Sequence, residues 1–294
     1  MLYEVTHITS YEYTSAVSVS YHVLRLHPRG VDRQCCRWHV LHIDPCPMVT
    51  QSHTDYFGNP LTFVTIEGAH HELIVTSKSH IDVSPAQHLN PADTPSWELV
   101  RDLGRGAQLE GSWEGCEFVF PSPLIPDLAA AAAYAAPSFS PGRPVLEAVL
   151  DLTRRIHRGF KFDPKATTVA TPLEEVMKSR RGVCQDFAHL EIACLRSMGI
   201  PARYVSGYLE TDPPPGQPRL VGRDASHAWV SFFCPESGWI DVDPTNNLLS
   251  STRHITVAWG RDYSDVSPIR GVLLGSGEHS LKVAVDVIPV SACI

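Results

Sequence analysis

Residues 180–190 constrain the fold most, because a turn there leads straight into an apolar helix and places Cys184 at its start. Apolar residues recur at spacings of three and four through 187–198, which predicts a buried helix. Gly199 is expected to end it. Unpaired backbone N–H groups and the positive end of the dipole favour a thiolate at a helix N-terminus, so this position suits a reactive cysteine.

A second, shorter helix is expected just upstream. Thr171 is a suitable N-cap, Pro172 suits the first helical position, and Glu174 completes a capping box. Gly182 is expected to end this helix, because glycine readily adopts the left-handed conformation found at helix C-termini. The two helices would therefore be separated by a sharp break.

The length of 294 residues and the hydrophobic content of 43% allow two domains, each with its own core. The formal net charge of -8, with no long basic run, argues against a nucleic-acid partner, because phosphate binding requires clustered lysine and arginine. The first residues lack the basic and apolar regions of a secretory signal, and the apolar run at 128–136 is too short to span a bilayer. We therefore expect a cytoplasmic protein with no membrane partner.

The eight cysteines are irregularly spaced and include no CxxC pair, so we expect most of them to be reduced and buried. The fifteen histidines form no recognisable metal motif. His39 and His42 lie three apart in a strand-like run and would point to opposite faces, and the pair at 70–71 stands alone. The sequence therefore predicts neither a metal site nor a cofactor.

Residues 1–84 are predicted to form an antiparallel β domain. Short runs of β-forming residues alternate with Pro, Gly and Asn turn signals, and nothing of helical period intervenes. No catalytic group of residues is visible in this part. The expected strands cover 3–8, 17–26, 38–43, 61–66 and 73–83.

Residues 85–144 are rich in Pro, Ala and Gly and are expected to form a connecting helical region. Two segments, 97–103 and 124–136, suit short helices, and the prolines after the second prevent it from merging with the next element. From Val145 onward, apolar residues recur at helical spacing. The catalytic core with its C-terminal strands is therefore expected to span 145–294.

After the helix of Cys184 the pattern changes to period two, which predicts β-strands. The second strand carries His227 at its start, and the third carries Asp243. These residue types are what thiol catalysis requires: a nucleophile, a base that accepts and returns its proton, and a carboxylate that orients the imidazole. The predicted fold class is α+β, with strands at 202–210, 226–233 and 239–245.

Two alternatives to this set have less support. His189 lies five residues after Cys184 on the same helix, so its side chain is rotated by roughly 140° and cannot act as the base. A serine enzyme is disfavoured because the chain contains no GxSxG elbow. His227 is therefore the better candidate for the base.

Three blocks of sequence resemble the transglutaminase-like superfamily, a group of papain-like Cys-His-Asp enzymes. They are GVCQD at 182–186, SHAWV at 226–230 and GWIDVDPT at 238–245. The resemblance is closest to the bacterial branch whose members are described as candidate cysteine proteases. That branch also carries an N-terminal β domain and a tail similar to residues 259–266, so the resemblance covers nearly the whole chain.

This resemblance implies a papain-like core in which Cys184 is the nucleophile, His227 the base and Asp243 the group that orients the imidazole. It also implies acyl transfer from an amide of a peptide or protein through a thioester. With water as acceptor the protein would be a cysteine peptidase or amidase, and with an amine it would be a protein-glutamine acyl transferase. A non-catalytic binding module is the alternative of another class. The calcium-binding loops of animal transglutaminases have no visible counterpart.

The choice of Asp243 over Asp241 or Asn246 depends on the register of the last predicted hairpin. A five-residue loop at 234–238 makes Asp243 a diagonal neighbour of His227 on the same face of the sheet. A loop of two or four residues would instead place Asn246 opposite His227. The Asp-Pro-Thr ending of the third block favours Asp243.

The segments 211–224 and 260–266 are expected to flank the substrate cleft. The first precedes the strand that carries His227, and the second follows the strand that carries Asp243. The alternative for the second segment is a packed structural turn.

Overall fold

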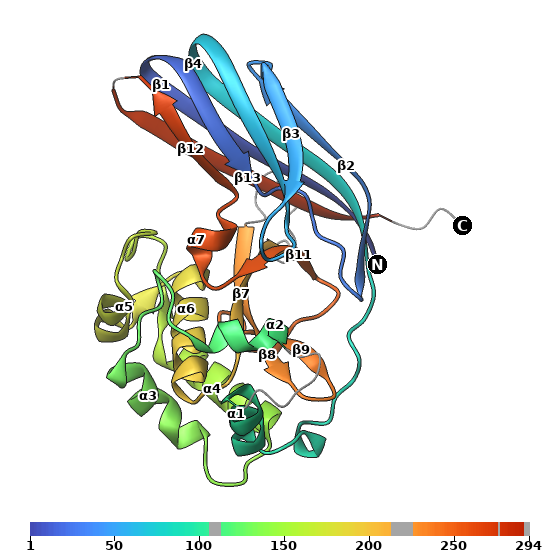
Figure 1. Cartoon of the computed structure of the whole chain (residues 1–294), viewed down its shortest axis with the longest axis vertical. Helices are drawn as coiled ribbons and strands as arrows, with labels where there is room; N and C mark the ends of the chain where they lie inside the picture. The colour runs from blue at the N-terminus through green and yellow to red at the C-terminus, as the bar shows by residue number, and fades with distance from the viewer. Residues whose placement is uncertain (106–112, 213–225, 276, 291–294) are drawn as a thin grey trace.

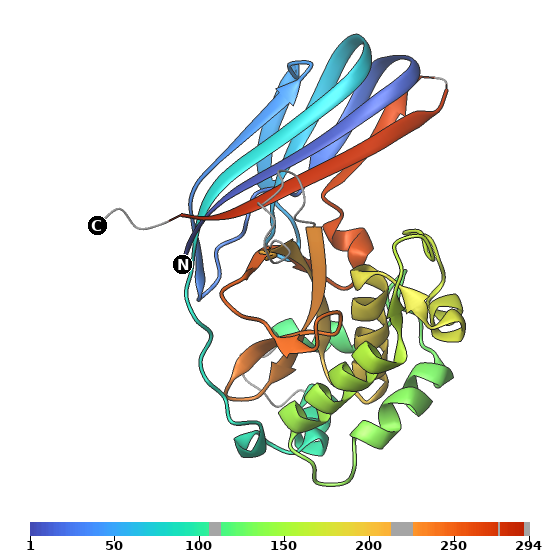
Figure 2. The same cartoon turned by 180° about the vertical axis from the view of Figure 1, so that it is seen from behind.

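The computed structural model describes residues 1–105, 113–212, 226–275 and 277–290. A twisted N-terminal sheet lies across one end of a core that combines helices with a second sheet (Figures 1 and 2). The strand pairs of both sheets are antiparallel. The predicted α+β class is therefore confirmed.

The N-terminal sheet is built on two very long strands, β1 (Leu2–Leu24) and β4 (Pro60–Val83), which pair along most of their length. Each of them joins two strands that were predicted as separate. β1 continues because the turn-like residues after Glu12 form a bulge, which shifts the register without ending the pairing. β2 (Gln34–Asp44) was predicted in part, whereas β3 (Val49–Thr54) was missed because all six of its residues are exposed and it lacks an apolar alternation.

The two C-terminal strands do not extend the core sheet. β12 (Ile269–Leu274) and β13 (His279–Val290) pair with the edge of β1, so the end of the range predicted for the core lies in the N-terminal sheet. Val285 and Val287 are buried there. The physical reason is that an unpaired β1 would leave a long row of open backbone groups, which the returning chain covers.

The core sheet has the order β10-β9-β8-β7-β11. Helix α6 (Cys184–Ser197) packs against its central strands and is buried along nearly its whole length, as the apolar pattern predicted. Helix α4 (Val145–Gly159) packs on α6. The strands are β7 (Ala202–Leu209), β8 (Ser226–Cys234), β9 (Gly238–Asp243), β10 (Leu248–Leu249) and β11 (His254–Gly260).

Short helices surround this core. The two predicted in the connecting region are present as α1 (Trp97–Arg105) and α3 (Ala129–Ala135), the latter shorter than expected because the chain is still extended at Leu128. No helix in the described ranges is long and apolar enough to cross a bilayer. The remaining helices are α2 (Trp113–Cys116), α5 (Leu173–Ser179) and α7 (Tyr263–Val266).

Two side-chain amides of the N-terminal part hold the outer edge of β11, an edge strand of the core sheet. Gln34 accepts a hydrogen bond from the Thr256 N–H at 2.8 Å and donates to the Thr256 carbonyl at 2.7 Å. Asn59 makes the same pair of bonds to Trp259, at 2.9 and 2.8 Å. Each amide therefore replaces one step of a β-ladder along an edge that would otherwise be open.

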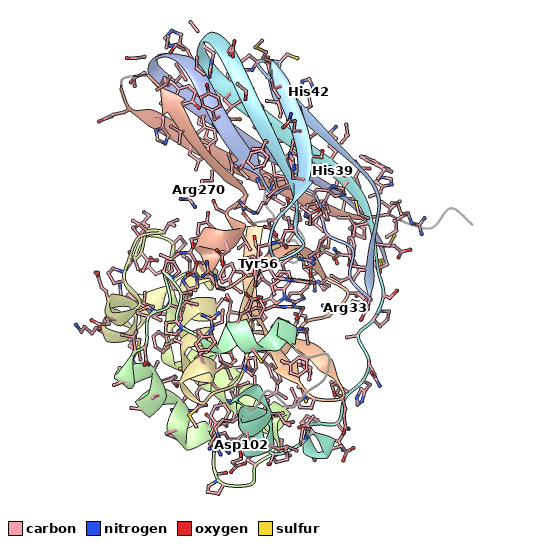
Figure 3. All side chains as sticks on the ribbon, viewed as in Figure 1. Arg33, His39, His42, Tyr56, Asp102 and Arg270 are labelled. Carbon is pink, nitrogen blue, oxygen red and sulfur yellow. The ribbon has the colours of Figure 1, made fainter. Side chains whose placement is uncertain are left out.

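Asn59 is fully buried, and its amide makes two more hydrogen bonds. Its Oδ1 accepts from Arg29 at 2.6 Å, and its Nδ2 donates to Asp55 at 3.0 Å. The Arg29 guanidinium also lies 3.2 Å from the centroid of the Trp259 ring. Next to Asp55, Tyr56 is 82% exposed at the junction of the two parts (Figure 3). Asn59 thus connects the N-terminal sheet to the core.

We predict that Asn59→Ala lowers the free energy of unfolding by about 3 kcal/mol, because it leaves several buried donors and acceptors without partners. Urea unfolding measures this loss. The control is Asn90→Ala, whose exposed amide bonds only Asp93 among the described residues and should matter little. Equal stability of Asn59→Ala and the wild type would contradict a structural role for this contact.

Candidate active site

The start of α6 is organised by Asp186 rather than by the residue before the helix. Val183 is the N-cap, and its N–H donates to Asp186 Oδ2 at 2.8 Å. Thr167 donates to the same oxygen at 2.6 Å, and burial raises the pKa of Asp186. A Cβ atom on Gly182 would lie 2.6 Å from this oxygen, so the folded-back carboxylate requires glycine there. Cys184 is thereby fixed in the first turn of α6, as predicted.

The predicted ends of the preceding helix were displaced. Pro172 is the N-cap of α5, and the Thr171 hydroxyl accepts a bond from Thr168 outside the helix instead of capping it. The left-handed residue that ends α5 is Arg180, with φ of 57°, and not Gly182. Gly182 is needed for close contact with Asp186 and not for a helix end.

The hairpin of β8 and β9 has the register that selects Asp243. Phe233 pairs with Trp239 and Ser231 pairs with Asp241, which is the register expected for a five-residue loop. The loop itself is shorter than predicted and covers only 235–237, because Cys234 and Gly238 also pair, and this leaves the register unchanged. His227 Nε2 lies 2.8 Å from Asp243 Oδ2, and both side chains are buried. Asp241 instead accepts from the indole of Trp229, and it pairs with Arg33. The predicted contact between His227 and Asp243 is confirmed, while its catalytic role stays a prediction.

Asp243 is a fully buried carboxylate with donors around both oxygens. Oδ1 accepts from the backbone N–H groups of Thr245 and Asn246, at 2.9 and 3.1 Å. Oδ2 accepts from the Asn246 amide at 2.7 Å and from His254 Nε2 at 3.2 Å, besides His227. Burial alone would raise the pKa of Asp243, but the hydrogen bonds to His227, His254 and Asn246 outweigh it and hold that pKa below its usual range. Asn246 therefore supports Asp243 and does not replace it.

His227 connects this carboxylate to Cys184. Burial alone would lower the pKa of His227, but its hydrogen bonds with Asp243 and with Cys184 outweigh that effect and raise the pKa to about 10. Because Nε2 is bonded to Asp243, Nδ1 is the ring nitrogen left to face Cys184. The arrangement holds a proton on the imidazole between a sulfur and a buried carboxylate.

His189 lies apart from this group, as the helical period predicted. Its Nε2 accepts a hydrogen bond from the Tyr263 N–H at 3.2 Å, and its ring packs on Tyr204. Burial lowers the pKa of His189 to about 4. It therefore fixes helix α7 against α6.

The segment 260–266 contains a packed turn. Asp262 is fully buried, caps α7 by accepting from Ser264, and also accepts from the Leu124 N–H at 2.9 Å. Arg261 pairs with Asp265 at 2.9 Å. These contacts support the structural alternative for Asp262. The other segment expected at the cleft, 211–224, lies outside the described residues from 213 onward.

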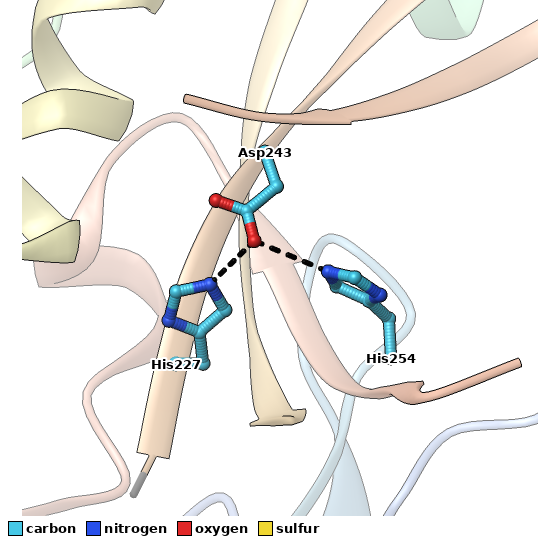
Figure 4. A group of neighbouring side chains, drawn as sticks. All are labelled: His227, Asp243 and His254. Atoms are coloured by element: carbon cyan, nitrogen blue, oxygen red, sulfur yellow. Dashed lines mark hydrogen bonds and ion pairs between the residues drawn. The ribbon is translucent and has the colours of Figure 1, made fainter. Parts of the chain in front are cut away.

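One group with metal-ligand geometry occurs in the described part of the chain: His227, Asp243 and His254, whose ligand atoms lie within 4.8 Å of one another. Both imidazoles point at the same carboxylate oxygen (Figure 4). The Nε2 atom of each ring is thus already paired with Asp243. A metal ion bound by the three side chains would have to replace the hydrogen bond that links His227 to Asp243. The chemistry of the group fits proton transfer better than metal binding.

His254 is the member of this group that the sequence did not single out. It begins β11, eleven residues after Asp243, and no local motif marks it. The one available signal was its position at the start of a strand dominated by apolar residues, where a histidine needs a polar partner.

Comparison with known proteins shows the family of the chain. Residues 132–244 match the transglutaminase-like superfamily, and residues 3–82 match the bacterial transglutaminase-like N-terminal region. An uncharacterized protein of Mycobacterium tuberculosis is 44% identical over 298 residues, which cover 98% of this chain and 92% of that protein. The chain belongs to the transglutaminase-like superfamily.

Two further comparisons extend this result. The crystal structure of a candidate cysteine protease from Cytophaga hutchinsonii superposes on this transglutaminase-like chain with a TM-score of 0.76 and 20% identity, covering 99% of this chain and 92% of that one. It shows the shared fold. A protein-glutamine gamma-glutamyltransferase of Pseudomonas aeruginosa is 33% identical over 123 residues, which are 35% of this chain and 18% of that protein.

We predict that the contribution of His227 to stability depends on pH. Its pKa is raised in the folded chain from 6.5 to about 10, so the stabilisation is fully present below the ordinary value and is lost as pH rises through the folded value. Urea unfolding should therefore show the largest difference between the wild type and His227→Gln near pH ~6 and a smaller one near pH ~10.

Burial raises the pKa of the Glu191 carboxyl to about 8, so this group also titrates in the same pH range. It is present in both the wild type and His227→Gln, so its effect cancels when their free energies of unfolding are subtracted. The control is His88→Gln, because the side chain of His88 is exposed. A difference that stays constant with pH would contradict a charged His227.

Proposed function

We propose that this transglutaminase-like protein is a thiol enzyme that cleaves amide bonds of peptides or proteins through a thioester on Cys184. The observation that supports it most is the position of His227, whose Nε2 lies 2.8 Å from the buried Asp243. Against the effect of burial, hydrogen bonding with Asp243 and Cys184 raises the pKa of this histidine. Nucleophile, base and orienting carboxylate thus come from α6, β8 and β9.

In the proposed mechanism, His227 holds the proton of Cys184 as an imidazolium, and the Cys184 thiolate attacks the amide carbonyl carbon. The first backbone N–H groups of a helix have no intrahelical partner, so the Cys184 N–H at the start of α6 is suited to hold the oxyanion. The imidazolium then gives its proton to the leaving amine. Asp243 keeps the ring oriented throughout, because four donors besides His227 set the orientation of the carboxylate.

The acceptor of the acyl group decides the kind of enzyme. We favour water, which makes the protein a cysteine peptidase or amidase. The second candidate is transfer to an amine, and it is favoured by the similarity of the core to a protein named as a protein-glutamine gamma-glutamyltransferase. A binding module is disfavoured, because burying the charged pair of His227 on β8 and Asp243 on β9 costs desolvation energy that a scaffold does not need to spend.

We place this reaction in the cytoplasm. The neighbours Cys35 and Cys36 form no disulfide, and neither does the nucleophile Cys184. A reducing compartment keeps such thiols available. We expect a peptide or protein as substrate, with no nucleic acid or membrane involved.

The proposal is tested by incubating the protein with a peptide library, with and without an added primary amine, and recording ammonia, cleavage products and cross-linked masses. We expect cleavage or ammonia release by the wild type and loss of turnover in Cys184→Ala with an unchanged melting curve. The matched control is Cys35→Ala, because Cys35 is exposed on the N-terminal sheet and should be dispensable. Turnover that survives in Cys184→Ala would refute the assignment. Amine incorporation in place of cleavage would favour the transferase.

A further inference from the structure

We infer that His254 is a positioning residue of the thiol centre, holding Asp243 in the orientation that His227 requires. This inference rests on the proposed function. His254 Nε2 lies 3.2 Å from Asp243 Oδ2, the same oxygen that lies 2.8 Å from His227 (Figure 4). Figure 4 shows the two imidazoles approaching this oxygen from different directions.

The protonated nitrogen of His254 is assigned by its second contact. The Ser251 N–H donates to His254 Nδ1 at 3.2 Å, so Nδ1 must be the acceptor nitrogen of the ring. The hydrogen of the neutral ring therefore lies on Nε2, where it points at Asp243. A backbone group thus fixes His254 as a donor to the carboxylate.

Packing fixes the ring as well as its tautomer. His254 is 2% exposed, and its ring meets the ring of Trp229 nearly at a right angle, with centroids 5.2 Å apart. Trp229 is itself fully buried and donates from its indole to Asp241. A Cβ on Gly207 would lie 2.5 Å from the Trp229 ring, so this glycine makes the space in which Trp229 supports His254.

The N-terminal sheet holds the strand that carries His254. Two residues beyond it, Thr256 is bonded through both backbone groups to Gln34, and Trp259 is bonded in the same way to Asn59. The position of His254 relative to Asp243 therefore depends on contacts between the two parts of the chain. This gives the N-terminal sheet a role in organising the site.

The effect on Asp243 follows from the directions of its donors. Two backbone N–H groups hold Oδ1, whereas side chains alone hold Oδ2, the oxygen that faces His227. Removing the donor at His254 leaves the Asn246 amide as the one described side chain besides His227 that restrains Oδ2. The carboxylate can then rotate, and the imidazole loses its fixed orientation toward Cys184.

Two substitutions separate this role from packing. His254→Phe keeps a buried ring against Trp229 and removes the donor. We expect kcat to fall by about tenfold with little change in KM, because one charge-assisted hydrogen bond is lost. His254→Gln can place an amide N–H near the position of Nε2, and we expect it to recover most of that loss. Thr256→Val is the control on the same strand, because it keeps both backbone bonds to Gln34.

A second readout does not need turnover. In histidine labelled with nitrogen-15, NMR of the full chain should show His254 protonated at Nε2, and the His227 Nε2–H resonance should shift in His254→Phe and return toward its original place in His254→Gln. If the wild type is active and kcat falls equally in His254→Phe and His254→Gln, the inference is overturned. It is also overturned if kcat does not fall in His254→Phe. Both results leave the proposed function intact. If the wild type is inactive, the proposed function fails, and an unshifted His227 resonance in His254→Phe then overturns the inference by itself.

Discussion

The candidate site depends on one buried charge. The Asp243 carboxylate has no exposure to solvent, and a buried carboxylate without partners would cost several kcal/mol. Its five donors come from β8, from the turn after β9, and from the start of β11, so three strands must meet with correct register before the charge is satisfied. The same hydrogen bonds that offset this cost also orient His227 between Asp243 and Cys184. Folding of the core sheet and assembly of the site are thus one event.

The N-terminal part of the chain contributes to the assembly of the site by binding the outer edge of β11. β11 belongs to the core sheet, yet its outer backbone groups are bonded by the amides of Gln34 on β2 and of Asn59, the residue before β4. β12 and β13 return to pair with β1, so the first and the last described strands lie in one sheet. The core and the N-terminal sheet therefore support each other, and the site lies in the part of the core that depends on both.

Much of this could be predicted from the sequence, because the decisive signals are local. The apolar period placed Cys184 at the start of α6, and the loop length set the register that brings Asp243 to His227. The pairing of β12 and β13 could not be predicted, since an apolar strand fits either sheet equally well. His254 was missed because its partner, Asp243, belongs to another strand. Thr171 was wrongly predicted as the N-cap of α5, because its hydroxyl accepts a hydrogen bond from the Thr168 N–H instead.

The central claim is that the buried pair of His227 and Asp243 activates Cys184, and the alkylation of the native chain tests it most directly. Iodoacetamide near neutral pH, followed by peptide mapping, compares Cys184 with the exposed Cys35 and with the buried Cys194. The account predicts that Cys184, although only partly exposed, is modified fastest, and that His227→Gln abolishes this preference. Labelling of native Cys184 no faster than in the urea-unfolded chain would contradict the account.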